Sequence, residues 1–303
     1  MAEGETGGGA GTRWSVVVPT RARPGQLAGC LAALGTLRCD GGEPELIVVD
    51  DDPAGSAAAA VESSGAAHRV RLLAGGGRGP AAARNIGLTR ARGNWVAFTD
   101  DDCRPDARWL AGFDEALGCG AEAAAGLTRN GAPGACAEAS QMIVDVLGAV
   151  ERDEGGLRFA ASNNLAFRRE ELLELGGFDE GFPDAAGEDR ELCDRWVRSG
   201  RRIASAPGAV VVHCHELGLR AFWRQHLRYG RGARAFHRAR RDGGVGSPAP
   251  GRSFGPALAR EVRRGRPGSS RIELGALALL SQAATAAGYL SAALLRRGAG
   301  RKR

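Results

Sequence analysis

Three consecutive carboxylates, Asp100–Asp102, directly follow the apolar run Trp95–Phe98. The run is short and rich in aromatic and β-branched residues, which predicts a strand that enters a core. Three carboxylates at its end repel one another, so bringing them together is costly unless a cation or hydrogen-bond donors compensate. Two interpretations stay open for this segment alone: a solvated acidic turn, or a set of oxygen ligands for a hard divalent cation.

A second acidic run, Asp50–Asp52, ends the apolar segment "ELIVV" in the same way. Both runs belong to a series in which predicted strands alternate with predicted helices. The strands are expected within 13–24, 44–53, 68–76 and 94–102, and the helices within 25–37, 54–65 and 79–92. This alternation predicts βαβ units and a parallel sheet, whose ligands bind outside the carboxyl ends of the strands. The position of both acidic runs therefore favours a metal and nucleotide site over solvated turns.

The composition is that of a globular protein, with 303 residues, 43% hydrophobic and 25% charged, enough for one large domain or two small ones. The net charge of +6 is unevenly distributed, because the chain from Arg220 onward holds 19 of the 41 Lys and Arg residues and three of the 35 acids. An acidic body with a basic tail indicates contact with something anionic. Nucleic acid, an anionic membrane face and a phosphorylated substrate all fit.

Seven scattered cysteines with no Cys-x-x-Cys pair argue against a disulfide framework or a structural zinc site. They indicate a reducing compartment, the cytoplasm. The first 14 residues lack a basic start followed by an apolar core, so they do not resemble a signal peptide. Residues 1–12 are expected to form a disordered, Gly-rich lead.

Six segments carry a resemblance to a known family. They are "SVVVPTRARP", "LIVVDDDP", "GPAAARNIGLTRARGNWVAFTDDDC", "SNNLAFRREELLELGGFDEGF", "GEDRELCDRWVRSG" and "PGAVVVHCHE". In this order and spacing the chain resembles family 2 glycosyltransferases of the GT-A fold from about residue 13 to 235. The resemblance implies an α/β fold with a mostly parallel central sheet flanked by helices. We expect a basic linker at 236–270 and an apolar, basic-flanked helix at 271–303 to follow this domain.

The resemblance implies a nucleotide pocket at the ends of the first strands. An aspartate of the Asp50–Asp51 pair would accept a hydrogen bond from the base, which suits the imide N–H of uracil or thymine and rejects cytosine. Arg84 would approach the base or a phosphate. The alternatives are an acidic turn before Pro53 and an exposed helix charge at Arg84. The implied nucleotide and donor residues are Pro19, Thr20, Arg21, Asp50, Asp51, Arg84, Asn85, Asp100 and Asp101.

The resemblance also implies a divalent cation, Mn²⁺ or Mg²⁺, held against the donor diphosphate. Asp100 and Asp102 match the family's Asp-x-Asp, and His213, which ends "AVVVH", matches a histidine that completes the metal shell. His215 has no such match. The cation has a chemical purpose, because breaking the sugar–diphosphate bond develops negative charge that a Lewis acid stabilises.

Glu188 and Asp189 match an acid pair that opens a helix in this family, with Asp189 at the position of the catalytic base. The implied reaction is inverting, with Asp189 taking the proton of the acceptor hydroxyl. The structural alternative is an acid pair favoured by the helix dipole. Contacts with the acceptor or the diphosphate are expected from Asn164, Asp179, Glu180, Gln225, Arg228 and Tyr229.

The end of the chain bears on processivity and membrane contact. Gln225-x-x-Arg228-Tyr229 resembles the Gln-x-x-Arg-Trp of processive members, with Tyr in place of Trp, but the several long apolar segments of a polymer channel are absent from the sequence. The segment 272–295 is long enough to span a bilayer, yet it is Ala-rich and interrupted by Glu273 and Gln282. These features favour a helix lying on the cytoplasmic membrane face.

The sequence therefore predicts a metal-dependent, inverting, non-processive glycosyltransferase. It would move a sugar from a nucleoside diphosphate donor, with UDP favoured, to a hydroxyl of a lipid-linked or polysaccharide acceptor. No nucleic-acid-binding motif is found. A nucleotidyltransferase is the rival enzyme class, although "PTRARPGQ" is a poor phosphate loop. A non-catalytic nucleotide-sugar-binding module is the third possibility, against which the joint retention of Asp100, Asp102, Asp189 and His213 argues.

Overall fold

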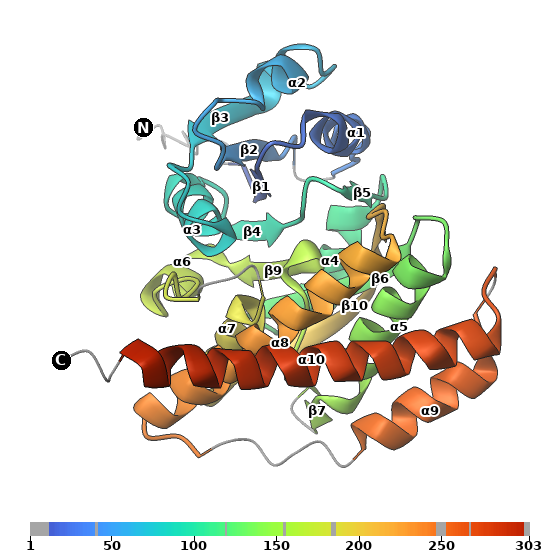
Figure 1. The fold of residues 1–303 in the computed structure, drawn as a ribbon. Coiled ribbons are helices and arrows are strands. Elements are labelled where there is room, and N and C mark those ends of the chain that lie inside the picture. The colour runs from blue at the N-terminus through green and yellow to red at the C-terminus, as the bar shows by residue number, and fades with distance from the viewer. Residues whose placement is uncertain are drawn as a thin grey trace, which may run out of the picture.

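An eight-stranded sheet organises the chain from Trp14 to His213, with strand order β3-β2-β1-β4-β9-β6-β10-β5. The computed structural model describes residues 12–39, 42–118, 120–153, 156–182, 186–246, 253–266 and 268–299, with side chains up to 292. The expected disordered lead lies outside these residues except for Thr12. Helices cover both faces of the sheet, and three further helices pack at its lower end (Figure 1).

The first half of the sheet is parallel and confirms the predicted alternation. Strands β2 (Glu45–Asp50) and β4 (Trp95–Phe98) flank β1 (Trp14–Thr20), and β3 (Val70–Ala74) lies outside β2. The connecting helices are α1 (Pro24–Leu34), α2 (Ala58–Glu62) and α3 (Pro80–Arg90), with the short 3-10 helix η1 (Ala67–Arg69) before β3. Both acidic runs begin where a strand ends, at Asp50 and after Phe98.

The second half mixes strand directions. Strand β9 (Leu165–Arg168) runs antiparallel between β4 and β6 (Ala123–Asn130), β10 (Ile203–His213) runs parallel to β6, and β5 (Cys103–Pro105) pairs antiparallel with the end of β10. The other elements are α4 (Trp109–Leu117), α5 (Ala135–Val150), the hairpin β7 (Arg152–Asp153) and β8 (Gly156–Leu157), η2 (Ser162–Asn164), α6 (Arg169–Glu174) and α7 (Glu188–Arg198).

The core explains why the central strands are apolar throughout. Every residue of β1 is buried, with Val16 and Val18 in the cluster on one face and Val17 in the cluster on the other. Successive side chains of a strand point to opposite faces, and a strand covered on both faces is therefore a continuous apolar run. This double burial holds the strand ends, and the carboxylates on them, in fixed positions.

Three helices follow the sheet: α8 (Leu219–Asp242), α9 (Phe254–Arg264) and α10 (Arg271–Ala299). The stretch 236–270, expected as a linker, contains the end of α8 and all of α9. Helix α9 forms because its apolar side chains bury against α5 and α10, with Ala257 and Leu258 in one cluster with Leu274 and Leu277. Helices α8 and α10 cross closely, since a side chain at Gly230 or Gly288 would clash with the backbone of the other helix.

Helix α10 is long and apolar enough to cross a membrane by length and composition, over Arg271–Ala292, and 28% of that stretch is buried inside the protein. Its buried face contacts α8, α5 and α9. Its outer face is exposed and apolar, with Ile272 at 86% and Leu279 at 75% exposure.

Candidate active site

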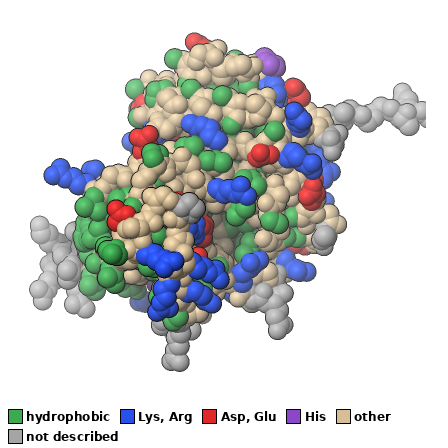
Figure 2. Space-filling view, turned by 90° about the vertical axis from the view of Figure 1, so that its right-hand side faces the viewer, with side chains coloured by type: hydrophobic (Ala, Val, Ile, Leu, Met, Phe, Trp, Pro, Cys, Tyr) green, Lys and Arg blue, Asp and Glu red, His purple; other side chains and the backbone are tan. Residues whose placement is uncertain are grey.

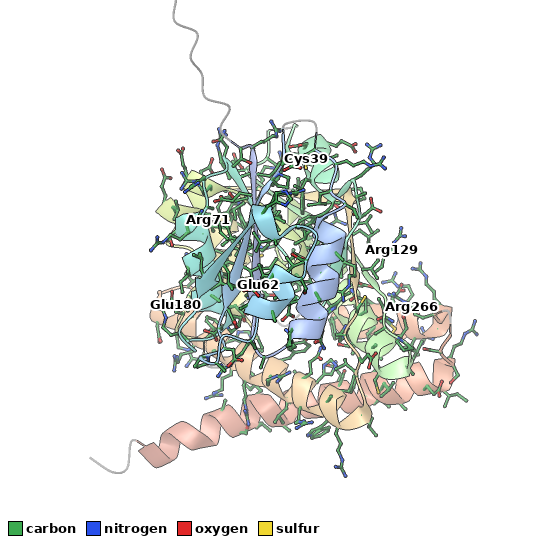
Figure 3. All side chains as sticks on the ribbon, turned by 90° about the horizontal axis from the view of Figure 1, so that it is seen from above. Cys39, Glu62, Arg71, Arg129, Glu180 and Arg266 are labelled. Carbon is green, nitrogen blue, oxygen red and sulfur yellow. The ribbon has the colours of Figure 1, made fainter. Side chains whose placement is uncertain are left out.

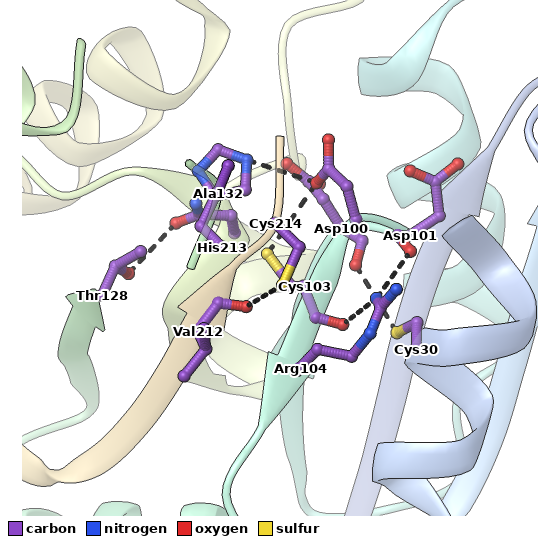
Figure 4. Close-up of polar contacts among 12 residues, drawn as sticks. Cys30, Asp100, Asp101, Cys103, Arg104, Thr128, Ala132, Val212, His213 and Cys214 are labelled. Carbon is purple, nitrogen blue, oxygen red and sulfur yellow. Dashed lines mark hydrogen bonds and ion pairs between the residues drawn. The ribbon is translucent and has the colours of Figure 1, made fainter. Parts of the chain in front are cut away.

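The acidic run Asp100–Asp102 and His213 meet because β5 pairs with the last residues of β10. Cys103 lies opposite His213 in the register, and the backbone N–H of Cys214 donates to the carbonyl oxygen of Asp102 over 2.8 Å. The imidazole Nε2 of His213 consequently lies 3.3 Å from Oδ1 of Asp102. Figure 4 shows His213 facing the acidic run that includes Asp100 and Asp101. The structure thus brings together two of the three predicted metal ligands.

The donor set fits a hard divalent cation. Ligand atoms of Asp102, Cys103 and His213 all lie within 4.8 Å of one another. Two neighbouring ligands of an octahedral ion, each about 2.1 Å from it, are about 3.0 Å apart, close to the separation of Asp102 and His213. Burial raises the pKa of the Cys103 thiol well above its usual value, so this group stays protonated and is a poor ligand. A carboxylate with one imidazole suits Mn²⁺ better than the softer metals that thiolates select.

Asp102 has basic partners on two sides, His213 and Arg23. Burial alone would raise the pKa of Asp102, but the hydrogen bond and charge of His213, together with Arg23, outweigh burial and lower it. The ring of His215 stacks on His213 with centroids 3.9 Å apart. His215 therefore packs against His213, a role that the family resemblance did not predict. Burial is the main reason that the pKa of His215 is lowered to about 4.

Arg23 is a site residue that sequence reasoning missed. Its guanidinium lies 2.7 Å from Asp101 and 2.9 Å from Asp102, and Thr20 donates to Asp101 over 2.7 Å. Burial raises the pKa of Asp101 to about 7 in spite of these two partners. The contacts tie the loop after β1 to the acidic run. The sequence did contain a signal for this role, the cationic "TRAR" at the end of β1. The acidic partners of Arg23, however, lie 78 or more positions away along the chain.

Arg84 joins the acidic run to the predicted base. Its side chain is buried, and its two terminal nitrogens lie 2.8 Å from Asp100 and 3.1 Å from Glu188. Burial alone would lower the pKa of this guanidinium, but Asp100 and Glu188 raise it, so Arg84 keeps its charge. The structure therefore makes Arg84 a buried bridge between the end of β4 and the start of α7. Its carboxylate partners leave it less available to a nucleotide phosphate than an exposed arginine.

Glu188 and Asp189 open α7, where the helix dipole favours negative charge. Gly187 precedes them at φ 92°, and a side chain there would clash with Gly232 of α8, so this turn requires glycine. Burial, reinforced by Asp189, raises the pKa of Glu188 to about 7. Burial also raises the pKa of Asp189, against the opposing effect of Arg84. A carboxylate with a raised pKa is a better proton acceptor, as a general base requires.

The carboxylates of Asp50 and Asp51 hold loops at the predicted nucleotide edge. Asp50 accepts from the backbone N–H groups of Asp52 and Ala57 at 3.0 and 2.8 Å. Asp51 accepts from those of Arg78 and Gly79, both at 2.9 Å, and Arg21 approaches it at 3.6 Å. Ionised carboxylates have about four acceptor positions, so both retain capacity for a ligand. Pro19 is buried in β1, at the edge that these loops border.

A pocket of about 750 Å³ adjoins the carboxylates and His213. Its polar wall includes Arg84, Asp100, Glu188, Asp189 and His213, which come from α3, the end of β4, α7 and the end of β10. The structure therefore gathers the predicted base and two predicted metal ligands around one space. Helices α5, α8, α9 and α10, strand β6 and the segment 157–164 supply most of the remaining lining.

The predicted acceptor residues divide into two groups. Gln225 and Tyr229 line the pocket, and the Gln225 amide donates to the hydroxyls of Tyr229 and Ser140 at 2.6 and 2.9 Å. Arg228 is exposed on the same helix and is absent from the lining that the described residues form. Asn164 borders the pocket, but its amide accepts from Trp109 over 2.8 Å and donates to the carbonyl oxygen of Ala209 over 3.0 Å. Its amide group therefore serves packing.

Asp179, Glu180 and Asn85 form a separate group at the surface. The Asn85 amide donates to Phe178 and Glu180 at 2.9 Å each, and Glu180 also approaches Arg78 at 3.3 Å. Asp179 accepts from the backbone of Gly181. Figure 3 shows Glu180 at the outer edge of the molecule, on the side away from Arg266. These residues hold the loop after α6 against α3, and none of them is among the described residues that line the pocket.

Comparison with solved structures supports the fold. A mannosyltransferase from Pyrobaculum calidifontis, in complex with GDP-Man and Mn²⁺, aligns with a TM-score of 0.62 at 23% identity, over 94% of this chain and 86% of that one. S. aureus TarS aligns with a TM-score of 0.52 at 15% identity, over 91% of this chain and 54% of that one. The sheet, its flanking helices and the C-terminal helix have the architecture of GT-A glycosyltransferases.

The sequence comparisons match part of the chain to a known family. Residues 15–137 match the model of glycosyl transferase family 2. The pre-mycofactocin glycosyltransferase of Mycobacterium tuberculosis is 32% identical over 161 residues, which are 50% of this chain and 34% of that protein. The chondroitin synthase of Escherichia coli is 27% identical over 166 residues, 44% of this chain and 24% of that protein. These matches support a family 2 glycosyltransferase, and the chain spans about a third or less of the length of these relatives.

Proposed function

We propose that the protein transfers one sugar from a nucleoside diphosphate donor to an acceptor hydroxyl, with inversion and with a divalent cation. The observation that carries this proposal is an array of two groups joined by the acidic run: His213 with Asp102, and Asp100 with Arg84 and Glu188, the residue before Asp189. His213 at one end of this array and Asp189 at the other both line the same pocket. Donor activation and acceptor deprotonation must occur in one space, and this arrangement supplies both.

Each residue of the site has a proposed role that follows from its position. Asp189 accepts the proton of the acceptor hydroxyl as its oxygen attacks the anomeric carbon in one displacement. Burial, which raises the pKa of Asp189, supports this assignment, and general-base help of this kind contributes about 10²–10⁴ in rate. Arg84 holds Asp100 and Glu188 in place. The loops fixed by Asp50 and Asp51 border the nucleotide, and Thr20 and Arg23 position the acidic run.

Asp102 and His213 would hold the cation, and Asp100 would join them through the carboxylate that Arg84 orients. When bound, a divalent cation neutralises charge that develops on the departing diphosphate. Mn²⁺ is our preferred ion because the donor set includes an imidazole. The structural neighbour with GDP-Man and Mn²⁺ supports a nucleotide-sugar donor with a metal. We favour a UDP-sugar, because a carboxylate of the Asp50–Asp51 pair would accept from the uracil imide N–H.

The acceptor is proposed to be a lipid-linked or glycan hydroxyl, and transfer is proposed to stop after one sugar. Tyr229 stands where processive relatives carry Trp, and one long apolar helix is found among the described residues. We propose a cytoplasmic enzyme, in keeping with the buried free thiols of Cys30, Cys103 and Cys193. Nucleic acid is not a proposed partner.

The test is a transfer assay on the purified chain with Asp189→Asn beside the unchanged protein. We expect transfer to fall about 10²–10⁴-fold while the affinity for UDP with Mn²⁺ stays within twofold. Asp179→Asn, a surface carboxylate outside the pocket lining, is the matched control. Near wild-type transfer by Asp189→Asn would remove the proposed base. Release of pyrophosphate instead of a nucleoside diphosphate would identify a nucleotidyltransferase, and nucleotide binding without turnover would identify a binding module.

We also propose peripheral membrane contact through the outer face of α10. Residues at spacings 4, 3, 4, 3 and 4 form one exposed apolar stripe: Ile272, Ala276, Leu279, Ala283, Ala286 and Leu290. Figure 2 shows Arg side chains gathered beside hydrophobic ones on the lower part of the molecule. Arginines beside an apolar helix face favour an anionic lipid surface.

Co-sedimentation with phosphatidylglycerol vesicles tests this membrane proposal. We expect binding to anionic vesicles that falls at least fivefold in Leu279→Glu, with Asp179→Asn as the unaffected control. Equal binding of Leu279→Glu and the unchanged chain would exclude this face.

A further inference from the structure

The pocket beside Asp189 has an apolar wall that the proposed chemistry does not require. We propose that this wall binds a compact apolar group of the acceptor. The acceptor would then be a hydroxyl compound with an aromatic ring or short alkyl group near the reacting oxygen. This inference rests on the proposed function and specifies its acceptor.

The apolar wall comes from a part of the chain that follows the family match, which ends at residue 137. Helix α5 contributes Ile143, Val144 and Leu147, and Phe159 and Phe254 come from the segment before η2 and from α9. Apolar side chains that line a pocket remain in contact with water unless an apolar ligand covers them. The polar residues of the lining come from other elements: α3, the end of β4, α7 and the end of β10. The pocket therefore offers polar groups for the reacting hydroxyl and apolar side chains for an apolar group of the same ligand.

A buried histidine adds a specific polar contact. His226 lines the pocket, is 1% exposed, and its Nε2 has no hydrogen-bond partner among the described residues. Burial lowers the pKa of His226 to about 4, so the ring is neutral and can exchange one hydrogen bond with an uncharged group. Its ring packs against Phe222 at 4.3 Å and Tyr229 at 5.2 Å between centroids. A buried polar atom without a partner is costly, and a ligand hydroxyl would satisfy this one.

The size of the pocket suits the reacting end of an acceptor together with a compact apolar group. Sites for single small molecules have volumes of about 300–1,000 Å³, and this pocket of about 750 Å³ must also admit the donor sugar. Helix α10 contributes Gln282 and Thr285 to the lining, so the C-terminal helices complete the pocket. The end of an acceptor that carries an apolar aglycone fits this space.

The experiment compares paired glycosides that differ only in their apolar group. The full chain, with UDP and Mn²⁺ present, is titrated calorimetrically with 4-nitrophenyl and methyl glycosides of glucose, mannose and galactose. We expect at least one 4-nitrophenyl glycoside to bind tenfold or more tightly than its methyl partner. Leu147→Gln should reduce this preference to less than threefold. His226→Phe should weaken the binding of both members of the pair, because it removes a polar contact that they share.

The matched control is Leu279→Gln, an exposed leucine on the outer face of α10, which should keep the tenfold preference. Thermal unfolding and UDP affinity, measured on the same samples, confirm that each variant is folded. Equal affinities within every pair, no binding of any aryl glycoside at millimolar concentration, or a preference that survives in Leu147→Gln would overturn the inference. Failure of the proposed function would appear separately, as loss of Mn²⁺-dependent UDP binding in the unchanged chain.

Discussion

Replacing Arg84 by methionine is expected to destabilise the protein strongly, because the described residues offer Asp100 and Glu188 no other charged partner of comparable burial. The side chain of Arg84 is 5% exposed, that of Glu188 is 6% and that of Asp100 is 27%. Methionine keeps the apolar stem and removes the charge. Breaking a buried ion pair by removing one partner costs about 3–5 kcal/mol. At about 2 °C per kcal/mol for a chain of this size, the melting temperature should fall by about 6–10 °C.

The loss should grow as the pH rises. In the unchanged protein the folded-state pKa of Glu188 is already raised to about 7 from 4.5, and Arg84 opposes that shift. Without Arg84 the folded pKa rises further. A carboxyl group with a raised folded pKa contributes most stability when it is protonated, and this stability is lost as the pH rises from the unfolded pKa through the folded one. The variant should therefore lie nearer the unchanged protein at pH 5.5 than at pH 8.5.

The assay is urea unfolding at pH 5.5, 7.0 and 8.5 in EDTA, since a divalent cation near Asp100 would replace part of the missing charge. The double variant Arg84→Met with Glu188→Gln should recover at least about 1 kcal/mol at pH 8.5, because it removes the carboxylate that was left unpaired. A loss below about 1 kcal/mol, or an equal loss at all three pH values, would refute the reasoning. Either result would mean that water already solvates these carboxylates.

Three further predictions concern the metal, the packing around the site and the C-terminal helices. Asp102→Asn should weaken Mn²⁺ binding at least tenfold by calorimetry, and unchanged affinity would exclude Asp102 as a ligand. Asn164→Leu should lower the free energy of unfolding by about 1–3 kcal/mol, because the indole N–H of Trp109 and the carbonyl oxygen of Ala209 lose their partner. UDP affinity should be retained. Loss of UDP affinity without destabilisation would instead indicate a ligand contact. Gly288→Val should lower the free energy of unfolding by about 1–3 kcal/mol and expose α10 to limited proteolysis; an unchanged digestion pattern would contradict the close crossing of α8 and α10.

Local patterns predicted the first half of the fold because each strand there is followed by a clear turn. Strands β1 to β4 and the positions of both acidic runs were predicted in this way. Contacts between distant segments could not be, and Arg23 illustrates why: its pairing with Asp101 and Asp102 depends on β1 lying beside β4. Asn85 and Asn164 match the family's segments, yet their amides bond to protein groups rather than facing open space. A residue type at a matched position does not reveal which neighbours already satisfy it.

Helix α9 was missed although its signal is present. Phe254, Ala257, Leu258 and Val262 follow a helical spacing, and all four pack in the cluster shared with α5 and α10. The surrounding arginines gave the segment the composition of a solvated linker. Arginine covers the outer face of a helix as readily as it does a loop, so composition alone cannot separate the two.

Helix α10 presents the opposite difficulty, because it has two apolar faces. Leu274, Leu277 and Ala284 are buried against the protein, whereas Ile272 and Leu279 face outward. The mean hydropathy averages over both faces, and the helix therefore resembles a membrane span. Spanning would require α10 to separate from α8, which would expose the buried face and open the crossing at Gly288. Contact with a membrane through the outer face would keep this packing and the pocket lining of Gln282 and Thr285 intact, and this is why we propose a helix that lies on the membrane.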